Sequence, residues 1–144
     1  MNLSIIIPVF NEASTLREIV SVVVKVDLPP EFTGRQIVLI DDCSTDGTRE
    51  VLKEYESKHT VVYHAVNGGK GNALRSGFKA ATGDVVIIQD ADLEYDPNEY
   101  RKLLQPIISG KADVVYGSRF AGGETHRVLF YWHSMGNKVL TWLS

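Results

Sequence analysis

Two aspartates separated by a single residue, Asp90 and Asp92, are the side chains of this sequence best suited to chemistry. They follow the apolar run 85–88, which predicts that they lie just beyond the end of a strand. Two carboxylates with this spacing can share one divalent cation, and their hard oxygen atoms favour Mg²⁺ or Mn²⁺. Such a cation would bridge to a diphosphate and neutralise charge that develops on a leaving group. The alternative is that one aspartate caps a turn while the other is solvated.

Each of the five apolar runs in the sequence is followed by a segment of polar, charged and glycine residues. The segments are 8–12, 41–47, 67–72, 90–94 and 117–119. In an open parallel sheet, ligands bind beyond the carboxyl ends of the strands. We therefore expect these segments to meet at one edge of a sheet, where their acidic side chains would repel one another unless a cation intervened.

The segment after the second run carries two adjacent acids, Asp41 and Asp42. An acid at a strand end can accept hydrogen bonds from a ribose hydroxyl or a base N–H, and we assign that role to Asp42. The role of Asp41 stays open between ligand binding and turn formation. We assign the turn and the helix N-cap to Ser44, Thr45 and Asp46.

A glycine-rich segment, 68–73, precedes a helical pattern, and backbone N–H groups at a helix N-terminus favour anions such as phosphate. Lys70 lies inside this segment, whose alternative interpretation is a tight turn. Arg119 follows the last apolar run and could hold a phosphate in a two-pronged contact, with Arg127 downstream. The alternative for Arg119 is a surface pair with a carboxylate. His64 shows no partner spacing, and we interpret it as structural.

The elements that must position these residues follow from the apolar pattern. The runs 3–10, 36–40, 60–63, 85–88 and 114–116 predict five strands. A run such as 85–88 does not alternate with polar residues, which is typical of strands covered on both faces. Helical spacing separates the runs, at 16–23, 48–55, 74–81 and 100–107. The alternation predicts an α/β fold with an open, mostly parallel sheet flanked by helices.

Length and composition fit one domain over residues 1–144. Its 44% hydrophobic and 23% charged residues exclude wholesale disorder, and its net charge of −3 argues against a nucleic-acid binder. We find neither a secretion signal nor an apolar run long enough to span a membrane, which predicts a cytoplasmic protein. A final apolar helix is expected over 128–144, and the absence of a stop signal after it predicts a C-terminally truncated chain.

Taken in order, the motifs at 5–12, 41–48, 69–73, 90–94 and 117–120 resemble those of family 2 glycosyltransferases with the GT-A fold. More narrowly, they resemble the dolichol-phosphate mannosyltransferase-like branch, which moves a sugar to a polyprenyl phosphate. This resemblance implies a UDP- or GDP-sugar donor, a divalent cation (Mg²⁺ or Mn²⁺) and inversion at the anomeric carbon. Glu94 stands where members of this branch often carry glutamine.

The resemblance also implies roles for individual residues. The nucleoside would be held by Pro8, Phe10, Glu12, Ile40 and Asp42. The diphosphate would meet Asp90, Ala91 and Asp92, with Lys70 nearby, and the metal would be held by Asp90, Asp92 and Glu94. Arg119 and Arg127 would bind the acceptor phosphate, and Asp90, Asp92 and Arg119 would carry catalysis.

We therefore expect an inverting hexosyltransferase that acts on a polyprenyl or dolichyl phosphate at the cytoplasmic face of a membrane. Residues 1–127 would form the donor-binding half, and 128–144 would begin the acceptor and membrane-interface region. Membrane contact would come through a missing C-terminal region. Two alternatives remain, namely transfer to a sugar hydroxyl and a nucleotide-binding fragment without turnover. The base, the sugar, the lipid length and the oligomeric state are left open.

Overall fold

The computed structural model describes residues 1–117. The helix expected over 128–144, together with Arg119 and Arg127, lies outside the described residues.

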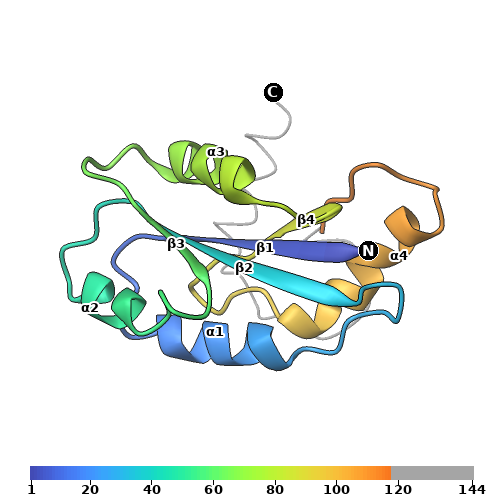
Figure 1. The fold of residues 1–144 in the computed structure, drawn as a ribbon, viewed down its shortest axis with the longest axis horizontal. Coiled ribbons are helices and arrows are strands. Elements are labelled where there is room, and N and C mark those ends of the chain that lie inside the picture. Colours follow the sequence, from blue (N-terminus) through green and yellow to red (C-terminus); the bar gives the residue numbers. More distant parts are fainter. Residues whose placement is uncertain (118–144) are drawn as a thin grey trace, which may run out of the picture.

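Four parallel strands form the centre of the described part (Figure 1). They are β1 (Asn2–Val9), β2 (Gly34–Asp41), β3 (Thr60–Tyr63) and β4 (Val85–Ile88). Their order across the sheet is β3-β2-β1-β4. The α/β fold with an open parallel sheet is therefore confirmed, as are the first four strands.

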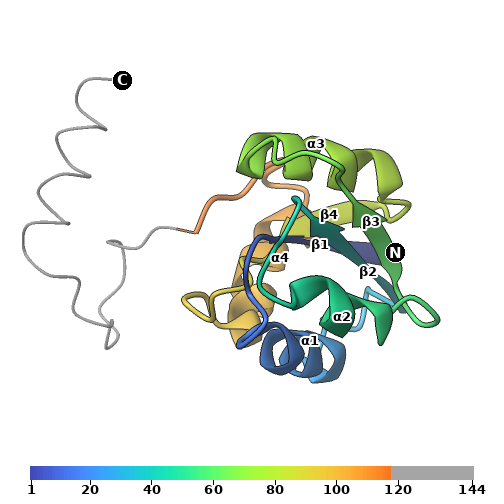
Figure 2. The ribbon, with the colours of Figure 1, turned by 90° about the vertical axis from the view of Figure 1, so that its left-hand side faces the viewer.

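Helices cover both faces of this sheet (Figures 1 and 2). One face carries α3 (Lys70–Ala80). The other carries α1 (Leu16–Lys25), α2 (Thr48–Lys53) and α4 (Tyr100–Ile108), the last preceded by the short 3-10 helix η1 (Pro97–Glu99).

The central strand β1 shows why its sequence is apolar without alternation. Ile5 and Ile7 pack into the cluster shared with α1 and α4, whereas Ile6 packs into the cluster beneath α3. All three side chains are fully buried. Because successive side chains of a strand point to opposite faces, a strand covered on both sides must be apolar throughout.

Helix α3 packs on the sheet through small residues, which differs from the apolar stripe expected from the sequence. Ala73 and Gly77 are its buried positions, and Phe78, which the spacing placed on the buried face, is 53% exposed. A Cβ atom added at Gly77 would lie 2.4 Å from Cγ2 of Ile6. The missing side chain therefore lets the helix backbone approach β1 more closely than periodicity alone suggests.

The fifth expected strand, 114–116, is wrong as far as the structure describes it. The segment carries no strand assignment, and Val114 and Tyr116 are 65% and 89% exposed. β4 pairs with β1, and no described strand pairs with its other edge. Pairing with a neighbouring strand is not encoded in the apolar run itself, so the run alone does not decide whether a strand forms.

Candidate functional site

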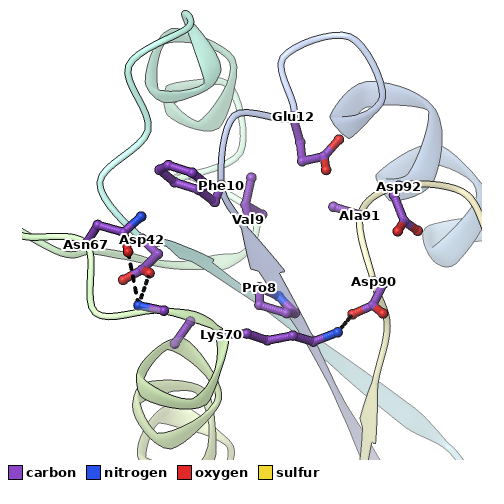
Figure 3. Close-up of a pocket in the computed structure, with 12 residues that line it drawn as sticks. Pro8, Val9, Phe10, Glu12, Asp42, Asn67, Lys70, Asp90, Ala91 and Asp92 are labelled. Carbon is purple, nitrogen blue, oxygen red and sulfur yellow. Dashed lines mark hydrogen bonds and ion pairs between the residues drawn. The ribbon is translucent and has the colours of Figure 1, made fainter. Parts of the chain in front are cut away.

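The loops after the strands enclose a cleft of about 380 Å³ at the carboxyl edge of the sheet (Figure 3). Its lining comes from the end of β1, from the loops after β1, β2, β3 and β4, and from the start of α3. The lining residues are Pro8, Val9, Phe10, Glu12, Asp42, Asn67, Gly69, Lys70, Ala73, Asp90, Ala91 and Asp92. The expected meeting is confirmed for the segments 8–12, 41–47, 67–72 and 90–94; of 117–119 only Gly117 is described, and it does not line the cleft. Ile40 differs from the other predicted binding residues, because its side chain is fully buried in the core beneath α3.

Asp42 anchors the glycine-rich loop that opens α3. Its carboxylate accepts hydrogen bonds from the N–H groups of Gly68, at 3.0 Å, and Gly69, at 2.6 Å. The Nδ1 atom of His64 lies 2.7 Å from the same carboxylate. Burial opposes ionisation of Asp42, but the hydrogen bonds from Gly68, His64 and Gly69 outweigh it and lower the pKa of the carboxyl group. Asp42 lines the cleft and also holds one wall of it in place.

Asp41 has a structural role, which resolves the question left open by the sequence. Its side chain is fully buried and accepts hydrogen bonds from the Ser44 N–H, at 3.1 Å, and from Nε of Arg49, at 2.7 Å. It does not line the cleft. Asp41 therefore supports the turn after β2 from beneath, while the neighbouring Asp42 faces the cleft.

The turn after β2 is tied to the turn after β1 by side-chain hydrogen bonds. Ser44 Oγ accepts a bond from the Asn11 N–H at 2.9 Å, and Asn11 Oδ1 accepts one from the Thr45 N–H at 2.8 Å. Asp46 accepts bonds from the Thr48 N–H and the Ala13 N–H, which confirms its role in the turn. The capping assignment is wrong, because the N-cap of α2 (Thr48–Lys53) is Gly47. These bonds fix the two loops relative to each other.

Within residues 1–117, three residues other than glycine adopt left-handed backbone conformations, and all three lie in the strand-end loops. They are Asn11, Cys43 and Leu93, with φ angles of 53°, 67° and 64°. This conformation is unfavourable for a residue with a side chain, above all for Leu93. Strained backbone of this kind tends to cluster at functional sites, where surrounding contacts hold it.

Lys70 crosses the cleft from the start of α3 (Figure 3). Its Nζ atom lies 2.6 Å from Oδ1 of Asp90, and the two side chains are 58% and 20% exposed. Gly69, which precedes the helix, has a φ angle of 80°. The N-terminus of this 11-residue helix thus borders the cleft together with an ammonium group, an arrangement suited to an anion.

The two aspartates after β4 lie on the opposite side of the cleft. Asp90 points toward Lys70, whereas Asp92 lies farther along the same loop and accepts a hydrogen bond from the Glu94 N–H at 3.0 Å (Figure 3). Within residues 1–117, no three acidic, histidine or cysteine side chains lie close enough to hold a metal ion. The expected set of Asp90, Asp92 and Glu94 is therefore not gathered into a three-ligand site.

The donor chemistry of Asp90 and Asp92 nevertheless fits a divalent cation. Both present carboxylate oxygen atoms at the same cleft, and hard cations of this kind commonly take one or two carboxylates plus oxygen atoms of a bound phosphate. Asp90 and Asp92 are thus the two carboxylate ligands that the protein would contribute to a bound cation.

The segment after β1 supplies an aromatic and an acidic side chain. Phe10 is 48% exposed and lines the cleft. The backbone N–H of Glu12 donates to Thr48 Oγ1 at 2.9 Å, and its carboxylate accepts from Thr15 Oγ1 at 2.7 Å. These bonds hold Glu12 against the start of α1 with its carboxylate at the cleft.

The interpretation of His64 as a structural residue holds, but the sequence did not predict its contact with Asp42. Its Nδ1 atom contacts Asp42, and its Nε2 atom lies 2.8 Å from Oγ of Ser76 on α3. Asn67 was likewise not singled out, although it lines the cleft and accepts a hydrogen bond from the Gly69 N–H at 3.1 Å. Only the pairing of β2 with β3, which places Tyr63 opposite Asp41, brings His64 beside Asp42.

Comparison with known proteins places the chain among relatives of one kind. The family model described as "Glycosyl transferase family 2" matches residues 4–140. A dolichol-phosphate mannosyltransferase of Pyrococcus furiosus is 37% identical over 134 residues, covering 91% of this chain and 37% of that protein. An undecaprenyl-phosphate 4-deoxy-4-formamido-L-arabinose transferase of Klebsiella pneumoniae is 37% identical over 113 residues, covering 74% of this chain and 34% of that protein.

A solved structure is similar as well. The mannosyltransferase PcManGT of Pyrobaculum calidifontis, in complex with GDP-Man and Mn²⁺, aligns with a TM-score of 0.57 at 29% identity. The alignment covers 67% of this chain and 29% of that one. The chain thus spans little more than a third of the length of the curated relatives. None of the helices described over residues 1–117 has the length and apolarity that a membrane span requires.

Proposed function

The chain belongs to glycosyl transferase family 2, and from this membership we propose that its cleft binds the nucleoside diphosphate of a UDP- or GDP-sugar donor. The observation that carries the proposal is the composition of one cleft at the carboxyl edge of the sheet. It combines a helix N-terminus and Lys70 on one side with Asp90 and Asp92 on the other. Anionic phosphates and a bridging cation together satisfy both sides, whereas either one alone leaves like charges facing each other.

Each part of the cleft has a role in this proposal. The diphosphate lies at the N-terminus of α3 and takes the Lys70 ammonium. The base contacts Pro8 and the ring of Phe10, and the Glu12 carboxylate accepts from the ribose hydroxyls. Asp42, which accepts from three donors of the protein, also lines the cleft and uses a remaining lone pair of its carboxylate to accept from the nucleoside.

A divalent cation fits the carboxylates of Asp90 and Asp92, with Glu94 nearby in sequence. When bound there, Mg²⁺ or Mn²⁺ supplies positive charge that stabilises the diphosphate as it leaves the sugar. Support comes from the similar mannosyltransferase, whose structure was determined in complex with GDP-Man and Mn²⁺. Asp90 must exchange its contact with Lys70 for this new set of partners.

We further propose that the reaction is inverting transfer of a hexose to a polyprenyl or dolichyl phosphate. An oxygen atom of the acceptor phosphate displaces the nucleoside diphosphate, so one C–O bond to the sugar forms as the other breaks. A phosphate monoester is largely ionised at neutral pH, with a second pKa of about 6, so the reaction needs no general base. The chain's residues then act by positioning.

The names of the two relatives, both polyprenyl-phosphate sugar transferases, support this choice of acceptor. Arg119 and Arg127 keep their assignment to the acceptor phosphate as a proposal. With a lipid acceptor, the protein works at the cytoplasmic face of a membrane.

Calorimetric titration tests the donor site directly. UDP and GDP are each titrated into the chain with Mn²⁺ and, separately, with EDTA. We expect one nucleotide to bind in the micromolar range and EDTA to weaken it. Asp92→Ala should weaken binding by about tenfold or more, since a charge-assisted contact contributes about 1.5–3 kcal/mol. Asp27→Ala serves as the control, because Asp27 is exposed and lies before β2, at the opposite edge of the sheet.

If neither nucleotide binds to a folded sample, the proposed function is wrong for this chain. Nucleotide binding without sugar transfer to a polyprenyl phosphate would retain the donor site and refute the proposed acceptor reaction for these 144 residues.

A further inference from the structure

Three side chains from three separate elements form a line that ends at the glycine-rich loop. Oγ of Ser76, on α3, lies 2.8 Å from Nε2 of His64, which follows β3. Nδ1 of His64 lies 2.7 Å from Asp42, which follows β2. Asp42 in turn accepts the N–H groups of Gly68 and Gly69. The side chains of His64 and Asp42 are only 12% and 4% exposed.

The chemistry of the partners fixes the protons along this line. The Asp42 carboxylate, whose pKa is lowered by its surroundings, is ionised at neutral pH and can only accept hydrogen bonds. Nδ1 of His64 must therefore carry the proton. In the neutral ring, Nε2 is then an acceptor, and the Ser76 hydroxyl donates to it. With a neutral ring, Ser76 therefore donates to His64, and His64 donates to Asp42.

A Ser–His–Asp line is also the arrangement of an activated nucleophile, but the surroundings here do not suit that chemistry. Neither Ser76 nor His64 lines the cleft to which Asp42 belongs. The N–H groups of the glycine-rich loop that could stabilise an oxyanion in another setting, those of Gly68 and Gly69, already donate to Asp42. The line is therefore suited to holding a loop rather than to reacting.

The loop between β3 and α3 depends on hydrogen bonds to keep its position. Residues 65–69, between β3 and α3, are all exposed, so apolar burial does little to fix them. The same loop presents Gly69 and Lys70 to the cleft. If the carboxylate of Asp42 turned, the N–H groups of Gly68 and Gly69, which directly precede α3, would lose their common acceptor.

We propose that His64 is a positioning residue for nucleotide binding: it orients the Asp42 carboxylate, which holds the loop that carries Gly69 and Lys70. This inference rests on the proposed donor site. His64 touches no ligand itself. Its Nδ1 proton sets the rotation of the carboxylate, and Ser76 sets the plane of the ring.

Two amide substitutions of His64 separate its hydrogen bond to Asp42 from its contact with Ser76. In His64→Asn the side-chain NH₂ falls close to the position of Nδ1 and can still donate to Asp42, but it cannot reach Ser76. In His64→Gln the NH₂ falls closer to the position of Nε2, so the donor to Asp42 is lost. His59→Gln is the matched control, because His59 lies at the other end of β3 and stacks on Tyr55 away from the cleft.

Calorimetry with UDP or GDP and Mn²⁺ gives the first measurement. We expect His64→Asn and His59→Gln to bind within about threefold of the unsubstituted chain. We expect His64→Gln to bind about tenfold more weakly, since it leaves a buried carboxylate without one of its donors. The inference is overturned if His64→Gln binds as tightly as the unsubstituted chain, or if folded His64→Asn binds as weakly as His64→Gln.

Nuclear magnetic resonance without nucleotide gives the second measurement and is independent of the proposed function. The imidazole nitrogen shifts of His64 should show the proton on Nδ1, and a proton on Nε2 alone would overturn the inference even if His64→Gln failed to fold. The amide protons of Gly68 and Gly69 should exchange slowly in the unsubstituted chain and in His64→Asn, and faster in His64→Gln. If these signals behave as expected but no nucleotide binds, the proposed function fails while the hold on the loop stands.

Discussion

Replacing Lys70 by methionine should change metal binding and nucleotide binding in opposite directions. In the absence of ligand the Lys70 ammonium neutralises Asp90, one of the two carboxylates proposed to hold the cation. The same ammonium is proposed to contact the diphosphate when the donor binds. Lys70→Met keeps the apolar stem of the side chain and removes the charge, so it separates these two roles.

The exposure of the pair sets the size of the first effect. Lys70 is 58% exposed and Asp90 is 20% exposed, so solvent screens their attraction strongly. Pairs of this kind contribute about 0.5–1 kcal/mol, so releasing Asp90 should strengthen Mn²⁺ binding without nucleotide by about two- to fivefold. The loss of a charge-assisted contact to the diphosphate costs about 1.5–3 kcal/mol, which weakens nucleotide binding by about tenfold to a hundredfold.

Two titrations measure these effects separately. Electron paramagnetic resonance of free Mn²⁺ gives the affinity for the ion alone, and calorimetry in saturating Mn²⁺ gives the affinity for the nucleotide. Lys79→Met is the matched control, because Lys79 is exposed in the last turn of the same helix. Two results would refute the reasoning: weaker Mn²⁺ binding in Lys70→Met, or unchanged nucleotide binding.

Three further substitutions or conditions test the framework around the cleft, each by urea unfolding. Gly77→Ala should lower the free energy of unfolding by about 1–3 kcal/mol, because its Cβ would lie 2.4 Å from a β1 side chain. Gly71→Ala in the same helix, with nothing within 4 Å of its Cβ, should leave stability unchanged or raise it by up to about 1 kcal/mol, and equal losses would contradict this view of the packing. Because the folded-state pKa of Asp42 is lowered, its contribution is complete above about pH 4 and is lost as the pH falls through that lowered value, so Asp42→Asn should show a flatter pH dependence in acid. Arg49→Met should lower the free energy of unfolding, since it leaves the fully buried Asp41 without its guanidinium partner, and unchanged stability would argue against that ion pair.

Much of the fold could be predicted because local sequence carries its own structural information. The apolar runs gave the first four strands, and their lack of alternation indicated a sheet covered on both faces. The fifth run, 114–116, has the same composition but forms no described strand, since a strand depends on a neighbour as well as on its own side chains. Helix α3 shows a similar limit, because Gly77 and the close approach to β1 decide which of its residues are buried.

Some features of the candidate site could likewise be predicted from the sequence, and others could not. The gathering of acids, glycines and Lys70 at one edge could be predicted from the sequence, because parallel strands all end on the same side of a sheet. Which of the two adjacent acids faces the cleft could not be predicted. Only the folded chain shows that Asp41 is buried with Arg49, that Asp42 faces the cleft and that His64 is the partner of Asp42. Residues 22 positions apart in the sequence, such as Asp42 and His64, meet only when β2 and β3 pair in one particular register.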